Sequence, residues 1–433
     1  MIRKSRVFLA LALIYAVPAW AGNANLSDLY QMALENDAEY AAARESFKAG
    51  QERIPQGRAG LLPTVSLGAN ANYNESRSSI SPSSDYASRS LSLTVTQPIY
   101  RKQNLEAFEQ SKVQALVSEQ QLKLAEQKLL LTVAQAYFAV LQAQDVLATA
   151  QSQKEAYAEQ LAQARKSFEV GTVTITDVHE AKARFDLTTA QEIAGQNDLE
   201  VKRRSLEKII SRESPELAKL VGEAKLMLPE PNNMDAWVKQ AEEDSIAVHL
   251  GQSALEIARR DVARQRGGHH PTLDLAASYS DSHNPSSLVA SSRAGTIGLN
   301  LGWVLYQGGA IDSRVREAVA LQEKARYDLD NARRQARLDA RQGFLGVQSG
   351  DAQVKAYEQA QISSEAQLKS TKLGLEVGVR TRVDVLNAQQ QLFTTRRDLA
   401  AARYQTLVAG LQLKAAAGRL SQDDLKVLDA LLK

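Results

Sequence analysis

The stretch LEVGVRTRVDVLNA, residues 375–388, repeats an earlier stretch of the same chain, FEVGTVTITDVHEA, residues 168–181. Seven of the fourteen aligned residues are identical, at an offset of 207 positions. Offsets of 207 and 208 also align two further pairs of segments: AYFAVL (136–141) with GFLGVQ (343–348), and LLPTVSLGA (61–69) with HHPTLDLAA (269–277). Matches spread along the chain at nearly one offset indicate two tandem copies of a unit of about 200 residues.

The first 21 residues have the pattern of a secretory signal peptide. Arg3, Lys4 and Arg6 precede the apolar run VFLALALIYAV, and the small-residue motif AWA ends at Ala21. We therefore predict export, with the mature chain beginning at residue 22. Without these three basic residues the formal charge changes from +2 to about −1, so no basic surplus suggests a nucleic-acid partner. The sequence has no cysteine, which excludes disulfides, thiolate metal sites and an N-terminal lipid anchor.

The region between Pro98 and Pro215 is predicted to be helical, because only Gly171 and Gly195 interrupt a run rich in Ala, Gln, Leu, Glu and Lys. A helix over residues 101–170 would be about 105 Å long, too long for a compact domain. Gly171 is expected to reverse the chain into a return helix that ends near residue 211.

Shorter helices are predicted over residues 26–54 and 235–266. We expect 235–266 to stack end to end with the first return helix, and 26–54 with the helix after Gly378. An extended coiled-coil scaffold is an alternative for such helices. Alanines on several faces favour a wall in which each helix has neighbours on both sides.

Four segments alternate apolar and polar residues, which predicts strands with one apolar face, each 9 to 11 residues long and able to cross a bilayer core. Their apolar positions are Val65, Leu67, Ala69, Ala71 and Tyr73; Leu91, Leu93 and Val95; Leu273, Leu275, Ala277 and Tyr279; Ile297, Leu299, Leu301 and Trp303. Residues 74–89 and 280–293 are expected to form exposed loops. Tyr73, Tyr86 and Trp303 are candidates either for an interfacial girdle or for ordinary strand packing.

No stretch after the signal approaches 18 apolar residues, so membrane contact is expected through the strands alone. Four strands cannot close a barrel, and an open sheet edge is not stable in lipid. The chain is therefore predicted to oligomerise. Eight strands would enclose only side chains, whereas twelve or more would leave a conduit.

The repeated order of helix, two strands and helix resembles the TolC family of outer-membrane efflux and secretion channels, over essentially the whole mature length. The motifs that carry this resemblance are LLPTVSLGA, HHPTLDLAA, the LYQGG at 305–309, and the two VG tips followed by TDV and VDVLNA. The resemblance implies an α+β membrane protein that forms a homotrimer. In it, four transmembrane β-strands per chain would build a 12-stranded barrel, continued by tandem-duplicated long helical hairpins as a periplasmic α-barrel.

On this basis the first structural repeat spans residues 22–232 and the second spans 233–417. The first would contain a β-hairpin at about 62–99 and a helical tip at 170–172, and the second a β-hairpin at about 271–306 and a tip at 377–379. An equatorial C-terminal segment, 418–433, would join residues 213–233 in a belt around the tunnel.

The resemblance also implies a gate at the periplasmic entrance. Asp384 matches an acidic residue that narrows the entrance, and three copies would form a carboxylate ring attractive to cations. A second aspartate of the family is Asn387 here. Arg380 matches a residue that ties the inner hairpin to its neighbour, but the position of its acidic partner is occupied by Ala162. Asp177, the twin of Asp384, is expected to be a helix-start carboxylate on the outer hairpin.

Six residues at the tips match the contact points of the family for a periplasmic adaptor protein: Val170, Gly171, Thr172, Val377, Gly378 and Val379. Glycine at a chain reversal is also explained by backbone geometry alone. His269 and His270 are adjacent, and His179, His249 and His283 stand alone. None has the spacing of metal ligands, so no enzyme, cofactor or metal site is predicted.

The main hypothesis is a passive exit duct in the outer membrane, in contact with its lipid and with a large periplasmic part. It would serve tripartite efflux pumps, type I protein secretion or both, recruited by a periplasmic adaptor (membrane fusion protein) and an inner-membrane transporter, ABC-type or proton-driven. The alternative is a periplasmic coiled-coil adaptor or scaffold. The sequence does not decide the cargo. Because it lacks a lipidation cysteine, the chain is more similar to the secretion branch of the family than to the lipid-anchored drug-efflux branch.

Overall fold

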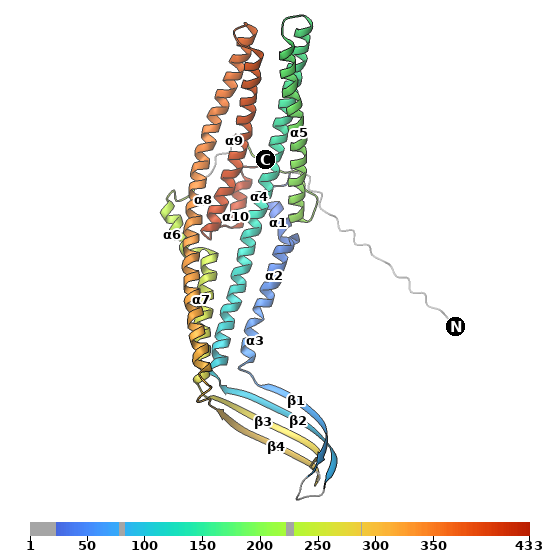
Figure 1. The fold of residues 1–433 in the computed structure, drawn as a ribbon. Coiled ribbons are helices and arrows are strands. Elements are labelled where there is room, and N and C mark those ends of the chain that lie inside the picture. The colour runs from blue at the N-terminus through green and yellow to red at the C-terminus, as the bar shows by residue number, and fades with distance from the viewer. Residues whose placement is uncertain (1–22, 78–82, 222–228, 287) are drawn as a thin grey trace, which may run out of the picture.

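The computed structural model describes residues 23–77, 83–221, 229–286 and 288–433; the predicted signal peptide lies outside these residues. The chain forms an elongated wall of helices that meets a four-stranded antiparallel sheet at a corner (Figure 1). The predicted combination of long helical hairpins with four strands is confirmed.

Two long helices run through the helical part: α4 (Lys102–Glu169) has 68 residues and α8 (Ala310–Glu376) has 67. From the far tips, the return helices α5 (Ile175–Ile210) and α9 (Arg382–Ala416) run back along α4 and α8, respectively. The length predicted for the first long helix agrees with α4 to within one residue at each end.

The short helices that precede the strands in each repeat are broken where continuous helices were predicted. The first region contains α1 (Leu26–Asn36), α2 (Ala38–Gln51) and α3 (Arg53–Ala59), and the second contains α6 (Met234–Asp244) and α7 (Ile246–Arg266). Asp37 ends α1 in an extended conformation, and its side chain accepts a hydrogen bond from Tyr40 N at 2.7 Å to start α2. A side chain that caps the next helix favours such a break.

The stacking predicted for these short helices is wrong. The end of α5 lies beside α1, where Ser211 Oγ donates to the carbonyl of Asn36 at 3.4 Å. The end of α9 lies beside α6, where a Cβ added at Gly418 would lie 2.2 Å from the carbonyl oxygen of Asp244. Each return helix therefore continues the short helices of its own repeat, because all of them cover the same long helix.

The expectation that no helix could span a membrane by composition is also wrong. Helix α4 contains an 18-residue window that is long and apolar enough to cross a membrane, by length and composition alone. Half of that window is buried inside the chain. The part of α4 from Leu129 to Leu141 contributes to the main core, in which Val133 and Tyr137 are completely buried. Core packing accounts for the apolar character of this helix.

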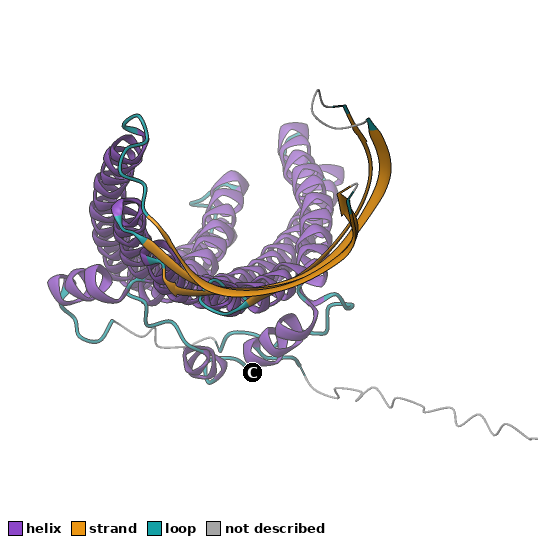
Figure 2. Cartoon of the chain, turned by 90° about the horizontal axis from the view of Figure 1, so that it is seen from below, coloured by secondary structure: helices purple, strands orange, loops and turns teal. Residues whose placement is uncertain are grey.

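A belt of small elements lies on the convex side of the arc formed by the long helices and the sheet (Figure 2). It contains α10 (Gln422–Asp429), which lies against α1, and residues near 217–220, which pair with Ala24 and Leu432. Tyr137 OH joins the belt to α4 by donating to the carbonyl of Ala218 at 2.6 Å. Residues 222–228 of the expected belt lie outside the described residues.

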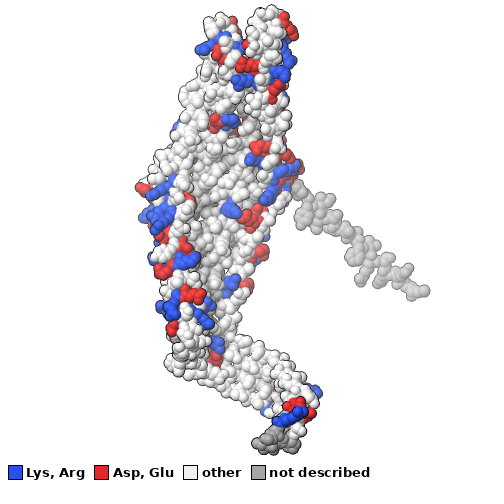
Figure 3. All heavy atoms as spheres, in the orientation of Figure 1, with Lys and Arg blue, Asp and Glu red and all other residues white. Residues whose placement is uncertain are grey.

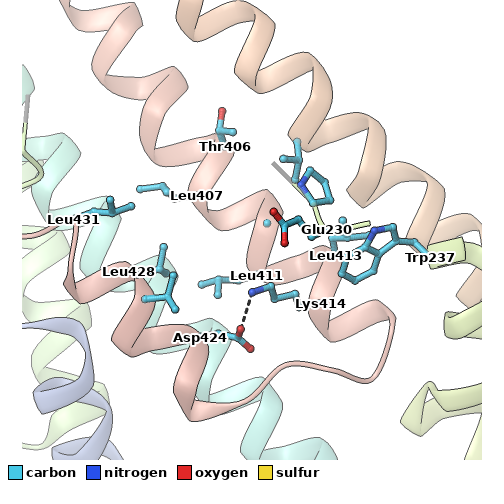
Figure 4. Close-up of a pocket in the computed structure, with 14 residues that line it drawn as sticks. Glu230, Trp237, Thr406, Leu407, Leu411, Leu413, Lys414, Asp424, Leu428 and Leu431 are labelled. Atoms are coloured by element: carbon cyan, nitrogen blue, oxygen red, sulfur yellow. Dashed lines mark hydrogen bonds and ion pairs between the residues drawn. The ribbon is translucent and has the colours of Figure 1, made fainter. Parts of the chain in front are cut away.

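A cavity of about 520 Å³ separates α9 from α10 and from the chain around Glu230 (Figure 4). Leucines of α9 and α10 form much of its wall, and Trp237 lies at one side. At its edge Lys414 Nζ lies 2.6 Å from Asp424 Oδ1, which links α9 to α10. The belt is thus held to the wall by apolar packing and by this ion pair.

The sheet consists of β1 (Thr64–Ser76), β2 (Ser84–Tyr100), β3 (Thr272–Ser286) and β4 (Val289–Gly302), in that order. The strands are 13 to 17 residues long, which exceeds the predicted 9 to 11. Pairing continues through much of both segments that were expected to be loops. The central pair, β2 with β3, joins the two repeats, and β1 and β4 are left as edges.

The strand register places the predicted apolar residues on one face of the sheet. Leu67, Leu93 and Tyr279 are neighbours across β1, β2 and β3, and Leu275 is opposite Leu299. Leu67 is 70% exposed and Leu299 is 66% exposed. The opposite face carries small polar side chains, including the cross-strand pairs Ser92–Ser280 and Thr94–Ser278. A sheet with large exposed apolar side chains on one face suits contact with lipid.

The three aromatic girdle candidates do not share a location. Tyr73 lies on the apolar face and is 74% exposed. Tyr86 is opposite Asn74, which places it on the polar face, so its prediction as a girdle residue is wrong. Strand β2 begins at Ser84, well before the alternating positions Leu91, Leu93 and Val95, and Tyr86 is an odd number of residues from them, so it lies on the opposite face. Trp303 follows the end of β4, and its Nε1 donates to the carbonyl of His269 at 3.0 Å.

Two glycines of α8 provide a test of how closely α8 and α9 pack. A Cβ added at Gly350 would lie 2.3 Å from Oγ1 of the buried Thr406, whereas at Gly346 the nearest atom would be 3.7 Å away. We expect Gly350→Ala to lower the free energy of unfolding by about 1–3 kcal/mol through overpacking. Gly346→Ala is the matched control and should be neutral or slightly stabilising. Denaturant unfolding of the detergent-solubilised protein measures both, and equal midpoints would contradict this packing.

Candidate functional site

The candidate site is the pair of helical tips, which have the same backbone design. At the first tip Gly171 N donates to Phe168 O and Thr172 N donates to Ser167 O. At the second, Gly378 N donates to Leu375 O and Val379 N to Gly374 O. Gly171 and Gly378 have φ values of 76° and 80°, a conformation that favours glycine. Both helices thus end in a Schellman motif.

Both return helices also begin in the same way. Thr174 and Asp177 form a reciprocal capping box at the start of α5, and Thr381 and Asp384 form one at the start of α9. In the second box the Thr381 hydroxyl lies 2.9 Å from Asp384 Oδ2. Hydrogen bonds from the backbone N–H and the hydroxyl of Thr381 hold the pKa of the Asp384 carboxyl below its usual value.

These motifs explain why the tip sequence occurs twice. The identical glycine, threonine and aspartate of each tip are the residues that end one helix and begin the next. Asp384 and Asp177 therefore share a structural role as capping residues. An aspartate at this position is thus not by itself evidence of a gate. A difference in function has to come from the surrounding residues, which are not identical.

Polar side chains join the second hairpin to the first near the tips. Arg382, at the start of α9, donates from its guanidinium to Ser167 Oγ of α4 at 2.9 Å. Arg184 of α5 donates to Oδ1 of Asn387 at 3.1 Å. The predicted gate residue Asn387 is thus held by a guanidinium from the other hairpin. In the first repeat, the positions that match Arg382 and Asn387 are Ile175 and Glu180.

Further from the tips, more hydrogen bonds link α4 to α9. Gln390 Oε1 accepts hydrogen bonds from Gln153 Nε2 at 2.9 Å and from Tyr157 OH at 3.2 Å. Tyr404 OH donates to Asp145 at 2.6 Å. Burial and this neighbouring carboxylate raise the pKa of Tyr404, so the hydroxyl keeps its proton. The sequence analysis missed these residues, because nothing in the sequence places α4 beside α9.

Arg380 is exposed in the monomer, and its backbone N donates to Gly374 O at 3.0 Å. Its aliphatic part lies over Gly374, where an added Cβ would be 2.7 Å from Arg380 Cγ. Ala162, at the position of the expected acidic partner, is exposed on α4. The link from Arg380 to a neighbouring hairpin stays a prediction.

The tips present apolar side chains to solvent. Val170 and Val379 are each 74% exposed and Val377 is 66% exposed. Just behind the tips, a groove of about 290 Å³ separates the hairpins; Gln160, Asp177, Lys372, Glu376, Arg382 and Gln389 are among its lining residues. Exposed valines beside a polar groove are suited to contact with another protein.

A curved wall of long helices, continued by a sheet with an apolar face and two open edges, defines an outer-membrane channel that extends into the periplasm. The model of the family of outer membrane efflux proteins matches residues 29–212 and again residues 237–419, and the chain belongs to this family.

The chain is similar to characterised proteins over most of its length. It is 34% identical to the outer membrane protein TolC of Escherichia coli, with coverage of 94% of this chain and 84% of that protein. It is 31% identical to the alkaline protease secretion protein AprF of Pseudomonas aeruginosa, covering 94% and 86%, respectively. The crystal structure of the outer membrane protein VceC of Vibrio cholerae shares the fold, with a TM-score of 0.79, 18% identity and coverage of 91% and 96%.

The protein is therefore an outer-membrane efflux channel with a large periplasmic helical part. The alternative of a periplasmic adaptor or scaffold is not supported by these matches. The relatives are transport proteins rather than enzymes.

Proposed function

We propose that three copies of the chain form one channel, with twelve strands in the membrane and the helical hairpins as a tunnel in the periplasm. The two unpaired edges β1 and β4 support this assembly, since open edges in lipid leave backbone groups without partners. Three sheets joined edge to edge would remove all such edges and leave a lumen lined by the polar face.

The assembled channel acts as a passive exit duct, and a periplasmic adaptor with an inner-membrane transporter supplies cargo and energy. The family match and the similarity to a protease secretion protein support a role in efflux, in type I secretion, or in both. The chain is proposed to have no catalytic activity of its own and to need no cofactor. The apolar outward face of the sheet is the observation that carries this function.

Reconstitution in a planar lipid bilayer tests the duct. The purified mature protein is expected to need detergent and to produce discrete conductance steps, with a mass in detergent of three chains. A protein that stays soluble without detergent and forms no channels would overturn the proposal.

The gate is proposed to lie at the periplasmic tips, where Asp384, Asn387 and Arg380 stand near the start of α9. The bonds of Arg382 to Ser167 and of Arg184 to Asn387 support a narrow resting entrance, because they hold α9 against the neighbouring hairpin. Opening would then require these bonds to break, and a partner that docks at the tips could supply the free energy.

The tip residues Val170, Gly171, Thr172, Val377, Gly378 and Val379 are proposed to contact the adaptor. We expect Val170→Ser with Val379→Ser to weaken adaptor binding at least about tenfold, since burying two valines is worth about 1.5–3 kcal/mol each. Binding of the purified adaptor to the reconstituted channel measures this effect. Leu373→Ser, at an apolar position 61% exposed on α8, is the matched control. Equal loss in the control would assign the effect to general hydrophobicity rather than to the tips.

A further inference from the structure

The outward face of the sheet changes from apolar to charged along a defined line. From the corner with the helices, β3 and β4 carry only apolar or small side chains on this face as far as Tyr279 and Gly295. The next outward pair is Asp281 with Arg293, and one step further Arg89 of β2 is opposite His283. On the face shown in Figure 3, too, charges on the sheet gather near its far end.

This line crosses the strands obliquely. Here one step is the distance between successive outward residues of a strand, which are two positions apart. The line begins at Arg293 on β4 and Asp281 on β3, and Arg89 on β2 lies one step further out. Glu75 on β1 lies two steps beyond Arg89. Strands of membrane barrels are tilted by about 35–45°, so a boundary parallel to the membrane must shift along successive strands. The oblique line therefore has the form expected of the outer boundary of the apolar band.

The charged groups on this line are not all neutralised. Arg293 Nε lies 3.0 Å from Asp281 Oδ2, which fixes the direction of its guanidinium although the side chain is 72% exposed. The second oxygen of that carboxylate is buried without a hydrogen-bond partner, and His283 Nδ1 lies 3.7 Å from it. Within the described residues, Arg89 has no ion-pair partner. In the part of the line from β4 to Arg89, two arginines and one histidine thus face one carboxylate; further out, Glu75 is paired with Arg77 and lies opposite Asp85.

We propose that Arg89, His283 and Arg293 bind the phosphate groups of a phosphorylated glycolipid in the outer leaflet of the membrane, an inference that rests on the proposed channel. Guanidinium groups bind phosphate through paired, charge-assisted hydrogen bonds. Leu91 is directly opposite Asp281 in the register and half exposed, and Leu93 follows it toward the membrane centre. A ligand that carries phosphates and acyl chains matches both parts of this surface, whereas a free phosphate uses only one.

Native mass spectrometry of the full-length channel in detergent, with added diphosphoryl lipid A, tests the site. We expect bound lipid A on the unmodified channel and at least about a tenfold loss of binding for Arg89→Gln, from the loss of a charge-assisted hydrogen bond. The pair Arg293→Gln with Asp281→Asn removes the second guanidinium without leaving an unpaired carboxylate and should act similarly. Arg334→Gln, on the exposed side of α8, is the control and should bind normally.

Three results would overturn the site. Unchanged binding by Arg89→Gln shows that the arginine does not contact the lipid, and equal binding of dephosphorylated lipid A shows that acyl chains alone suffice. Complete displacement by inorganic phosphate indicates a site for a free anion. Conductance of the same samples separates this inference from the proposed function. Variants that conduct normally and bind as much lipid A as the unmodified channel contradict the site alone. An unmodified protein without conductance contradicts the channel.

Discussion

Arginine at Leu299 or at Ile297 is expected to prevent insertion of the protein into the outer membrane. Both side chains lie on the apolar face of β4, where Ile297 is 74% exposed and Leu299 is 66% exposed. An arginine on the lipid face costs about 2–4 kcal/mol near the midplane, and a trimer would pay this cost three times. The amount of trimer in the outer-membrane fraction, compared with the unmodified protein, measures the effect.

The adjacent inward positions are matched controls in the same strand. Asn300 is opposite Asp274 and Thr296 is opposite Ser278, on the polar face. Arginine at either position should be tolerated and should shift ion selectivity toward anions, because the added charge would line the lumen. If all four variants inserted equally well, the assignment of the two faces would have to be abandoned.

Removal of the charge at Asp384 is expected to weaken block of the channel by multivalent cations at least about tenfold, because three carboxylates at a narrow entrance concentrate cations. Asp384→Asn is preferable to alanine, since the amide oxygen can still accept a hydrogen bond from Thr381 and preserve the start of α9. The block is measured as the loss of current when the cation is added on the periplasmic side of a reconstituted channel.

Asp177→Asn is the matched control, because Asp177 occupies the same position in an equivalent capping box. If Asp177→Asn relieved the block and Asp384→Asn did not, the first hairpin would line the entrance instead. The pKa of Asp384 is lowered, so its carboxylate stays charged until the pH falls through that low value. The block should therefore be constant between about pH 7 and pH 5, well above the ordinary pKa of aspartate.

Asn387 is expected to add little to this field even as an aspartate. Its Oδ1 already accepts a hydrogen bond from Arg184, so an aspartate at this position would pair with that guanidinium. Asn387→Asp should therefore strengthen the link between the hairpins more than it strengthens the block. This differs from the expectation that the resemblance alone suggests, in which a second carboxylate simply adds a second ring.

The tandem repeat, the two long helices, the four strands and the positions of both tips follow from the sequence alone. The reason is that the signals are local: two-residue alternation, absence of helix breakers, and a glycine followed by a Thr–Asp capping pair act between residues a few positions apart. The limits of this local information appear at Asp37, where the side chain caps one helix and so breaks a segment that was predicted to be continuous.

The tertiary structure alone decided which elements lie side by side. The bonds of Gln390 to Gln153 and of Arg184 to Asn387 join residues more than 200 positions apart. The packing of α1 beside the end of α5 joins Asn36 to Ser211, which are 175 positions apart. The same holds for the row formed by Arg89, His283 and Arg293, which becomes one surface only through the register of three strands. Such contacts form when distant segments bury their surfaces together, and the local pattern of each segment is compatible with more than one partner.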